Sequence, residues 1–158
     1  MNNRSESNGA SAEIQARQNL MRICAAASEA ELEDALTACG DIPQAEDIRP
    51  AEVGLVMLRG RMGGDGAAFN VGEATVTRAA VRLSDGATGF SYLLGRHPQR
   101  ARLAAIVDAL GQDAAWREKL DAALITPVNA RLAEAARIKA EETAATRVNF
   151  FTVVRGED

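Results

Sequence analysis

The segment that decides the fold is 53-VGLVMLRGRMGGDGAAFNVGEATVTRAAVRLSDGATGFSYLL-94. It contains three strand-like runs separated by glycine-rich turns, and we predict strands over Val53–Arg61, Thr75–Leu83 and Ala87–Leu94. The Asp85-Gly86 pair suits the positive dihedral angles of a tight hairpin, so the second and third strands should pair antiparallel. The first run is apolar on both faces, which is typical of a strand that lies centrally in a sheet or beneath a partner.

The second predicted strand separates charged from apolar side chains. Strand side chains alternate between two faces, so Arg78, Ala80 and Arg82 should share one face. The positions that alternate with them are Thr77, Ala79, Val81 and Leu83. We therefore expect one face of the sheet to be core and the other to carry arginine.

Helical patterns flank these strands. Helices are predicted at about residues 12–27, 28–40, 98–111, 113–123 and 128–145, and the second opens on a capping box of Ser28 and Glu31. The last helix has only a thin, alanine-rich apolar stripe, which allows close approach to another surface. Residues 1–11 are small and polar, a composition that predicts a flexible leader. The sequence thus predicts a single α+β domain over residues 12–158, with a small, mostly antiparallel sheet packed by several helices.

The C-terminal segment changes character. Residues 147–155 combine β-branched and aromatic side chains with no charge between Arg147 and Arg155, which predicts a strand. Such a segment favours aggregation when exposed, so it should pair into the domain's own sheet or lie against another chain. The candidate interface residues are Phe150, Phe151, Val153 and Val154.

Composition excludes several classes of partner. The formal net charge of the 158 residues is -4 and the pI is about 5.1, which argues against binding to duplex DNA or to an anionic membrane. The N-terminal residues lack the apolar core of a signal peptide, and no run approaches the roughly 18 apolar residues of a membrane span. We expect a soluble, cytoplasmic protein that neither binds nucleic acid nor inserts into a membrane.

The residues that most often carry catalysis or metal form no recognisable motif. His97 is the sole histidine and precedes Pro98 at a predicted helix start, which favours a structural role. Cys24 and Cys39 fit neither a disulfide framework nor a zinc motif, and reduced thiols are the simpler interpretation. Glu73 and Asp85 lie at a strand start and in a tight turn, so they make no convincing acid-base pair. We predict no catalytic residue, no metal site and no cofactor bound by this chain.

The glycine loop Gly60–Gly66 invites a phosphate-binding interpretation, because successive backbone N–H groups can cradle an anion. A Walker A loop, however, continues with Lys-Ser or Lys-Thr and a helix. Here 67-AAFN-70 and a predicted strand follow instead. The sequence favours a plain hairpin connection or an interface loop.

Arginine accounts for sixteen of the eighteen basic residues, Lys119 and Lys139 being the only lysines. This bias suits bidentate contact with carboxylate or phosphate, but genome base composition produces it too. The candidate residues for an anion site or an interface are Arg61, Arg78, Arg82 and Arg96, with Arg59 nearby in sequence. They could converge on an anion if their strands are neighbours. The alternative is a solvated face, or ion pairs with carboxylates of another subunit, which contribute only about 0 to 1 kcal/mol each at a surface.

Several short motifs, each weak alone, occur together in this chain. They are Gly54-Leu55-Val56, Arg61-Met62-Gly63-Gly64, Gly66, Gly72-Glu73, Thr75, Thr77-Arg78, Val81-Arg82, Asp85-Gly86, Gly95-Arg96, Phe150-Phe151-Thr152 and Val154-Arg155-Gly156. In their order and spacing they resemble PhnG, the G subunit of the bacterial carbon-phosphorus lyase core complex. The resemblance covers about Gln15 to Glu157, so only the polar leader lies outside it.

The resemblance implies a role in organic phosphonate catabolism, in a complex with the H, I and J subunits and with the ATP-binding-cassette-like K and L proteins of the pathway. In that family's pathway the I subunit, helped by G, H and L, displaces adenine from ATP with methylphosphonate. The product is α-D-ribose 1-methylphosphonate 5-triphosphate. The J subunit later cleaves the carbon-phosphorus bond with S-adenosylmethionine and an iron-sulfur cluster. The resemblance gives the G subunit no catalytic group of its own.

Two hypotheses follow from the sequence. In the first, the chain is a structural and assembly subunit without catalytic activity alone. In the second, the arginine face of Arg61, Arg78 and Arg82 binds the anionic substrate at a subunit boundary. An independent ligand-binding module is a third alternative, which would require the isolated chain to bind ATP or methylphosphonate.

Overall fold

The computed structural model describes residues 3–63 and 65–146, with side-chain environments from residue 12 onward. The elements are α1 (Asn3–Ala26), α2 (Glu29–Cys39), β1 (Ala45–Arg61), β2 (Ala68–Leu83), β3 (Thr88–Leu94), α3 (Pro98–Leu110), α4 (Ala114–Leu120), the π-helical turn η1 (Asp121–Ile125) and α5 (Thr126–Ala145). The α+β class is confirmed, with a three-stranded antiparallel sheet and helices. The predicted strand at 147–155, with its four interface candidates Phe150, Phe151, Val153 and Val154, lies outside the described residues.

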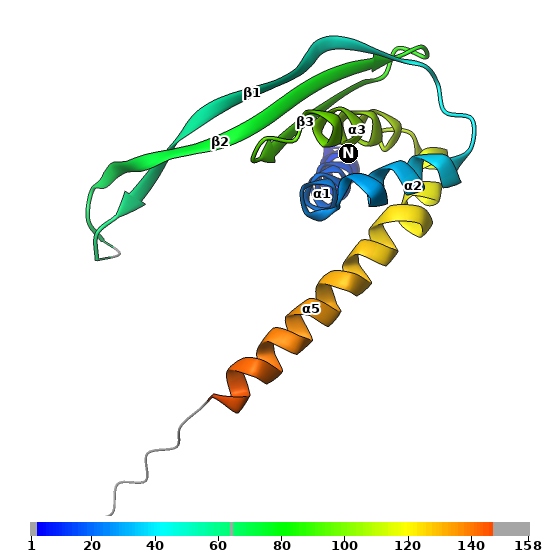
Figure 1. Ribbon diagram of the computed structural model, residues 1–158. Helices are drawn as coiled ribbons and strands as arrows, with labels where there is room; N and C mark the ends of the chain where they lie inside the picture. Colours follow the sequence, from blue (N-terminus) through cyan, green and yellow to red (C-terminus); the bar gives the residue numbers. More distant parts are fainter. Residues whose placement is uncertain (1–2, 64, 147–158) are drawn as a thin grey trace, which may run out of the picture.

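The helices gather on one face of the sheet (Figure 1). α3 packs directly on β2 and β3, and Gly89 permits this approach, since a Cβ there would lie 2.8 Å from the Cβ of Ala109. The core is built from aliphatic side chains of α1, α2, α3, the body of β2 and the turn η1. Of the second strand's predicted core face, Thr77, Ala79, Val81 and Leu83 are all buried, while Arg78 and Arg82 are exposed. The predicted alternation of a core face and an arginine face is confirmed, although Ala80, which shares the arginine face, is also buried.

The sheet order is β1-β2-β3, so β2 is central. The predicted hairpin between β2 and β3 is confirmed: Gly86 has φ +96°, and the Asp85 carboxylate accepts the Ala87 N–H at 2.9 Å. Of the two positions suggested for the first strand, the central one is wrong for the described sheet, because β1 is an edge strand; a position beneath a partner stays a prediction. β1 also begins at Ala45 rather than Val53. Pro50 lies within it, which an edge strand tolerates because a proline there removes no ladder hydrogen bond.

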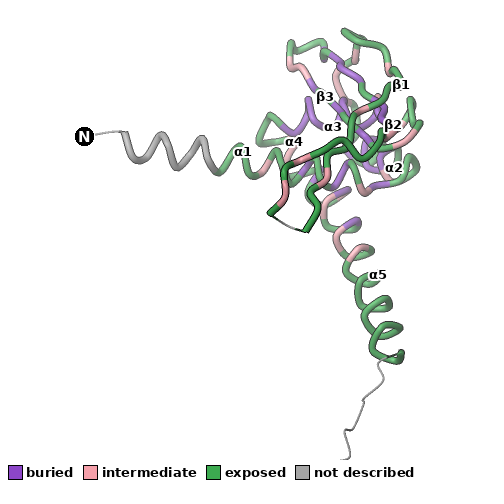
Figure 2. The backbone as a smooth tube through the Cα atoms, turned by 90° about the vertical axis from the view of Figure 1, so that its left-hand side faces the viewer, coloured by how far each residue is buried: buried purple, intermediate pink, exposed green. Residues whose placement is uncertain are grey.

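Two elements leave the body of the molecule (Figure 1). β1 and β2 continue past the end of β3 as a two-stranded ribbon, and α5 extends away as a long helix. Buried residues concentrate in the body, whereas the far parts of the ribbon and of α5 are exposed (Figure 2). Neither extension contributes to the core through its outer part.

Helix boundaries follow the predicted ones with two exceptions. α1 begins at Asn3, earlier than the predicted start near residue 12; the flexibility expected of residues 1–11 stays a prediction. The predicted break at Thr126-Pro127 is absent, since α4, η1 and α5 run on continuously. Proline lacks an N–H and its ring crowds the carbonyl one turn back. The wider π turn just before Pro127, in which the Thr126 N–H donates to Asp121 C=O, accommodates the proline.

Candidate functional site

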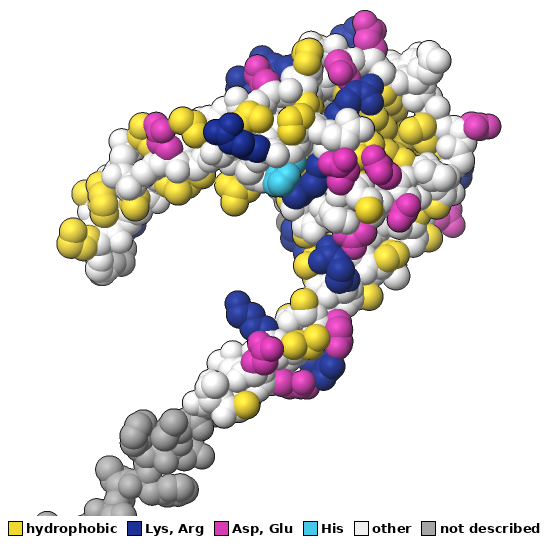
Figure 3. All heavy atoms as spheres, viewed as in Figure 1, with side chains coloured by type: hydrophobic (Ala, Val, Ile, Leu, Met, Phe, Trp, Pro, Cys, Tyr) yellow, Lys and Arg dark blue, Asp and Glu magenta, His cyan; other side chains and the backbone are white. Residues whose placement is uncertain are grey.

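The most unusual surface of the molecule is the outer part of the β1–β2 ribbon, which we call the arm: residues 53–61 of β1 and 68–75 of β2. From Leu55 of β1 outward the ribbon lies beyond the end of β3. Its large apolar side chains are exposed to between 41% and 63%. They are Val53, Leu55, Met57, Leu58, Phe69 and Val71. In Figure 3 hydrophobic side chains continue along the arm to its end. Clustered exposure of this kind marks an interaction site more often than a plain surface.

Both faces of the arm are apolar. The β1–β2 register runs without interruption from Glu52↔Arg78 to Leu58↔Gly72, so odd and even residues of β1 lie on opposite faces. Val53, Leu55 and Met57 share one face, and Val56 and Leu58 share the other. Sheets with one face in water normally show polar residues on that face. On the arm, Glu73 and Thr75 lie opposite Met57 and Leu55, but they interrupt an apolar face and do not form a polar one.

The root of the arm is tied to the start of α3. The Thr77 hydroxyl donates to Gly95 C=O at 2.7 Å and accepts the His97 N–H at 3.0 Å. Thr77 is fully buried. His97 is the N-cap residue of α3 and joins this link through its backbone N–H. This agrees with the structural role that the sequence favoured.

The arginines of the outer sheet face are partly engaged with acids of β1. Arg78 contacts Glu52 at 2.7 Å, with both side chains about half exposed, and Arg49 lies 3.5 Å from the same carboxylate. Exposed pairs of this kind contribute about 0 to 1 kcal/mol. Within the described chain, Arg49 and Arg78 therefore form exposed ion pairs with a carboxylate of the same sheet.

The other candidate arginines are spread along the ribbon. Arg61 is opposite Ala68 at the far end of the arm, whereas Arg82 is opposite Glu46 in the body. At about 3.3 Å per residue, the two registers are roughly 45 Å apart along β2. Arg96 follows Gly95, whose N–H donates to Thr75 C=O near the arm's root. The fold thus does not bring Arg61, Arg78, Arg82 and Arg96 together in one site of this chain, and their contact with an anion or another subunit stays a prediction.

The glycine loop connects β1 to β2 at the end of the arm. Gly66 N–H donates to Met62 C=O at 3.2 Å, Gly63 has φ +66°, and the Arg61 guanidinium lies 3.4 Å from Gly66 C=O. Because the loop joins two strands, it has no helix N-terminus to direct toward a phosphate.

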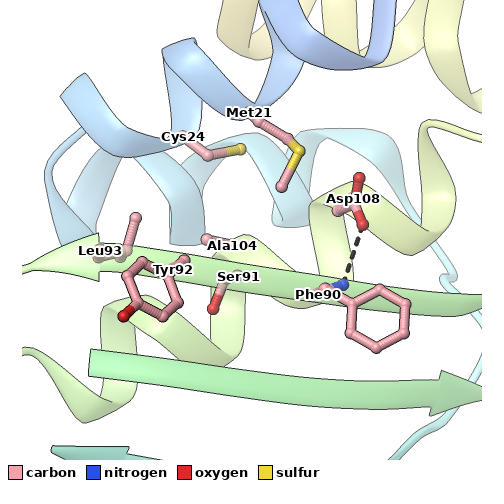
Figure 4. A pocket seen from close by; sticks show the side chains of 8 residues that line it. All are labelled: Met21, Cys24, Phe90, Ser91, Tyr92, Leu93, Ala104 and Asp108. Atoms are coloured by element: carbon pink, nitrogen blue, oxygen red, sulfur yellow. Dashed lines mark hydrogen bonds between the residues drawn. The ribbon is translucent and has the colours of Figure 1, made fainter. Parts of the chain in front are cut away.

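A small pocket lies between α1, β3 and α3, and Figure 4 shows its lining. Its volume is about 30 Å³, on the order of a water molecule's share of liquid. Asp108 is 1% exposed. Its carboxylate accepts two hydrogen bonds from Arg17, at 2.9 and 2.7 Å, and one from the Phe90 N–H at 2.9 Å. The pocket is too small for a nucleotide, and Asp108 is occupied in joining α1 and α3 to β3.

The two cysteines are buried and free. Burial raises the pKa of the Cys24 thiol to about 12 and also raises the pKa of Cys39. Thiols in such surroundings are poor nucleophiles and poor metal ligands, because both roles require the thiolate. Within the described ranges, no three His, Cys, Asp or Glu side chains lie close enough to hold a metal ion.

α5 is fixed at its base by a second ion pair. Arg131 contacts Glu31 at 2.7 and 3.1 Å and donates to Ala26 C=O at 2.9 Å. Glu31 also closes the predicted capping box with Ser28. Hydrogen bonds from Arg131, and after them those from Ser28, lower the pKa of the Glu31 carboxyl. Among the described helices, none is long and apolar enough to span a bilayer.

The sequence signalled only part of this arrangement. The charge of Asp108 within the apolar run 103-LAAIVDAL-110 marks it as a residue that needs a partner. Nothing local identifies that partner as Arg17, since the two lie 91 positions apart. The Glu31–Arg131 contact spans 100 positions, so local sequence could not predict it either.

Together, fold and surface define a small α+β protein whose main exposed feature is an apolar projection. A family model described as "Phosphonate metabolism protein PhnG" matches residues 15–156. The chain is also 56% identical, over 142 residues that make up 90% of each chain, to the alpha-D-ribose 1-methylphosphonate 5-triphosphate synthase subunit PhnG of Rhizobium meliloti (strain 1021). The chain therefore belongs to the PhnG family of phosphonate metabolism proteins.

Proposed function

We propose that this chain is a subunit of an α-D-ribose 1-methylphosphonate 5-triphosphate synthase and that its role there is structural, without catalysis of its own. The observation that carries the proposal is the arm, which exposes apolar side chains on both faces and has no cover within the described chain. A two-stranded ribbon is at best marginally stable in water by itself. A partner that covers it would stabilise it.

The site chemistry supports the same role. The buried carboxylate Asp108 is fully engaged, and both thiols are held protonated by burial. The partners we expect are the H, I and J subunits in the cytoplasm, with the K and L proteins associated with the pathway. ATP, S-adenosylmethionine and the iron-sulfur cluster would then be bound by other subunits.

Co-expression tests the proposal. The chain should co-purify with the I and J homologues of the same organism at fixed stoichiometry, and synthase activity should require it. A stable monomer that forms no complex with either homologue would contradict the proposal.

A second candidate function is direct binding of the anionic substrate at a subunit boundary. Its support is that Arg59 and Arg61 both lie near the end of the arm, where a partner's surface would come close. Arg78 is less suited, because Glu52 already neutralises part of its charge. Arg61→Ala should then raise the substrate concentration needed for adenine release while leaving assembly intact. Arg78→Ala serves as the comparison. Unchanged kinetics in both variants would remove these residues from the substrate site.

A further inference from the structure

The backbone of the arm presents an open hydrogen-bonding edge. At the two ends of the β2–β3 ladder, Gly95 N–H donates to Thr75 C=O and Leu83 N–H donates to Ala87 C=O, each at 2.8 Å. Antiparallel ladders alternate, so odd residues of β2 bond toward β3 and even residues bond toward β1. The even residues of β1 from Glu52 to Leu58 are their partners. The N–H and C=O groups of Val53, Leu55 and Met57 therefore point away from β2, along the free edge.

The two halves of β1 differ in how well this edge is protected against pairing with another strand. The half in the body, Ala45–Glu52, contains Pro50 and two register shifts. Half of its residues are charged. Arg102 of α3 donates to Ala45 C=O at 3.2 Å and to the Asp47 carboxylate at 2.8 Å. Proline, bulges, charges and a covering element are the devices by which proteins prevent edge-to-edge pairing.

The first six residues of β1 in the arm, Val53–Leu58, have none of these devices. From Val53 to Leu58 there is no charged residue and no proline, and the register is continuous. The three residues whose backbone groups face outward are 41%, 61% and 58% exposed. The edge of β1 is thus protected along one half of the strand and open along the other half. This difference indicates that the open half pairs with another strand.

We propose that an extended segment of a different subunit of the synthase adds to the arm as a β-strand along the free edge at Val53–Met57. This inference rests on the proposed function. The incoming strand exchanges main-chain hydrogen bonds with Val53, Leu55 and Met57. On the face that these three side chains share, its own side chains are apolar.

A second copy of this chain fits the edge less well. Antiparallel self-pairing about Leu55 would place Arg61 opposite Arg49 of the second copy, and like charges directly opposite destabilise a sheet. Pairing of two edges would also leave both apolar faces of the arm in water. A strand supplied by a folded partner domain brings further apolar surface to cover at least one of these faces.

Residue-resolved hydrogen exchange tests the inference on the full chain, alone and in the co-expressed synthase. In the isolated chain, the amides of Gly54, Val56 and Leu58 should exchange slowly and those of Val53, Leu55 and Met57 quickly. In the assembled synthase the three odd-numbered amides should become at least about tenfold slower, because each gains a hydrogen bond.

Leu55→Pro provides the matched perturbation, since it removes an outward N–H and leaves the bonds to β2 in place. Leu55→Val is the control: it has a similar side-chain size and keeps the N–H. We expect Leu55→Pro to weaken association by about tenfold relative to Leu55→Val, with equal circular dichroism of the two isolated chains.

Three results would overturn the inference. If the synthase assembles but the three odd-numbered amides exchange as in the isolated chain, the strand addition is wrong and the assembly role stands. If no complex forms, the inference and the proposed function both fail. If the isolated chain protects these amides in a concentration-dependent manner, a second copy occupies the edge.

Discussion

At the scale of single residues, Asp108 and Arg17 show how one buried charge connects three elements. The carboxylate is buried and accepts hydrogen bonds from α1 and β3, whereas the Arg17 side chain is 42% exposed. Removing either partner leaves the other without its counter-charge. The consequences differ, because water can reach the guanidinium but not the carboxylate.

We therefore expect Arg17→Ala to lower the free energy of unfolding by about 3 to 5 kcal/mol, the cost of a stranded buried charge. Asp108→Ala should lower it by less, roughly 2 to 3 kcal/mol, since it leaves the Phe90 N–H unpaired and the arginine solvated. Urea denaturation measures both. Arg137→Ala, on an exposed pair of α5, is the control and should leave the free energy of unfolding unchanged within experimental error. The reverse order of the two losses would contradict this account.

Cys24 gives a second prediction at this scale. Its pKa is raised to about 12, first by burial and then by the nearby Asp108 charge, so the thiol stays protonated at pH 8. Alkylation by iodoacetamide should be negligible in the folded chain and should rise with urea in parallel with unfolding. Mass spectrometry of the labelled peptides measures this. Rapid modification of Cys24 without denaturant would show that the packing of α1 is looser than described.

At the scale of elements, the attachment of α5 depends on Glu31. The folded-state pKa of this carboxyl is lowered below its ordinary 4.5. A lowered pKa means that the ionised form stabilises the fold at neutral pH, and that this contribution is lost as the pH falls through and below 4.5. The side chain is 29% exposed, so the total contribution of cap and ion pair is modest, about 1 kcal/mol.

Glu31→Gln should accordingly lower stability by about 1 kcal/mol at pH 7, and the difference from the unmodified chain should shrink below pH 4.5. Thermal unfolding followed at a series of pH values measures this. Glu29→Gln is a matched control, because it removes a charge from the same helical turn without touching Arg131. A gap between Glu31→Gln and the unmodified chain that stays undiminished as the pH falls below 4.5 would exclude the ion pair as its source.

Local patterns predicted most elements because local physics decides them. The Asp85-Gly86 turn, the capping box of Ser28 and Glu31, and Pro98 in the first turn of α3 all depend on a few neighbouring residues. The length of β1 and β2 beyond β3 could not be predicted, since a strand continues only while a partner does. The continuity of α4 into α5 was also missed. A proline usually ends a helical pattern, and a single π turn here absorbs it.

The candidate site was predicted less well than the fold. The alternation of Arg78 and Arg82 with buried positions was correct, yet alternation says nothing about how far Arg61 lies from Arg82 along the ribbon. The apolar character of residues 53–58 was visible in the sequence and was taken as a sign of a central strand or of one beneath a partner. The fold excludes the central position in the described sheet, and the same apolar residues now support the arm as an interaction surface.

At the scale of the whole molecule, we expect separate parts of the chain to provide stability and association. The core contains no large side chain from the arm, so the body should fold without it. Replacing residues 57–73 with Asn-Gly would close a hairpin on the Val56↔Ala74 pair, with a turn suited to two-residue loops. We expect the shortened chain to unfold within about 1 kcal/mol of the full chain, because the removed side chains are exposed.

The same excision should abolish co-purification with the other synthase subunits. It removes Met57, Leu58, Phe69 and Val71 and with them most of the exposed apolar surface of the arm. Of the open edge, Val53 and Leu55 remain. A control in which residues 62–67 alone are replaced by a short glycine-serine loop should assemble normally, since it leaves both strands intact. Equal yields of complex from the excised and the full chain would place the assembly surface elsewhere, with α5 as the next element to remove. Loss of assembly with an unchanged melting profile would show that the arm serves association and not folding.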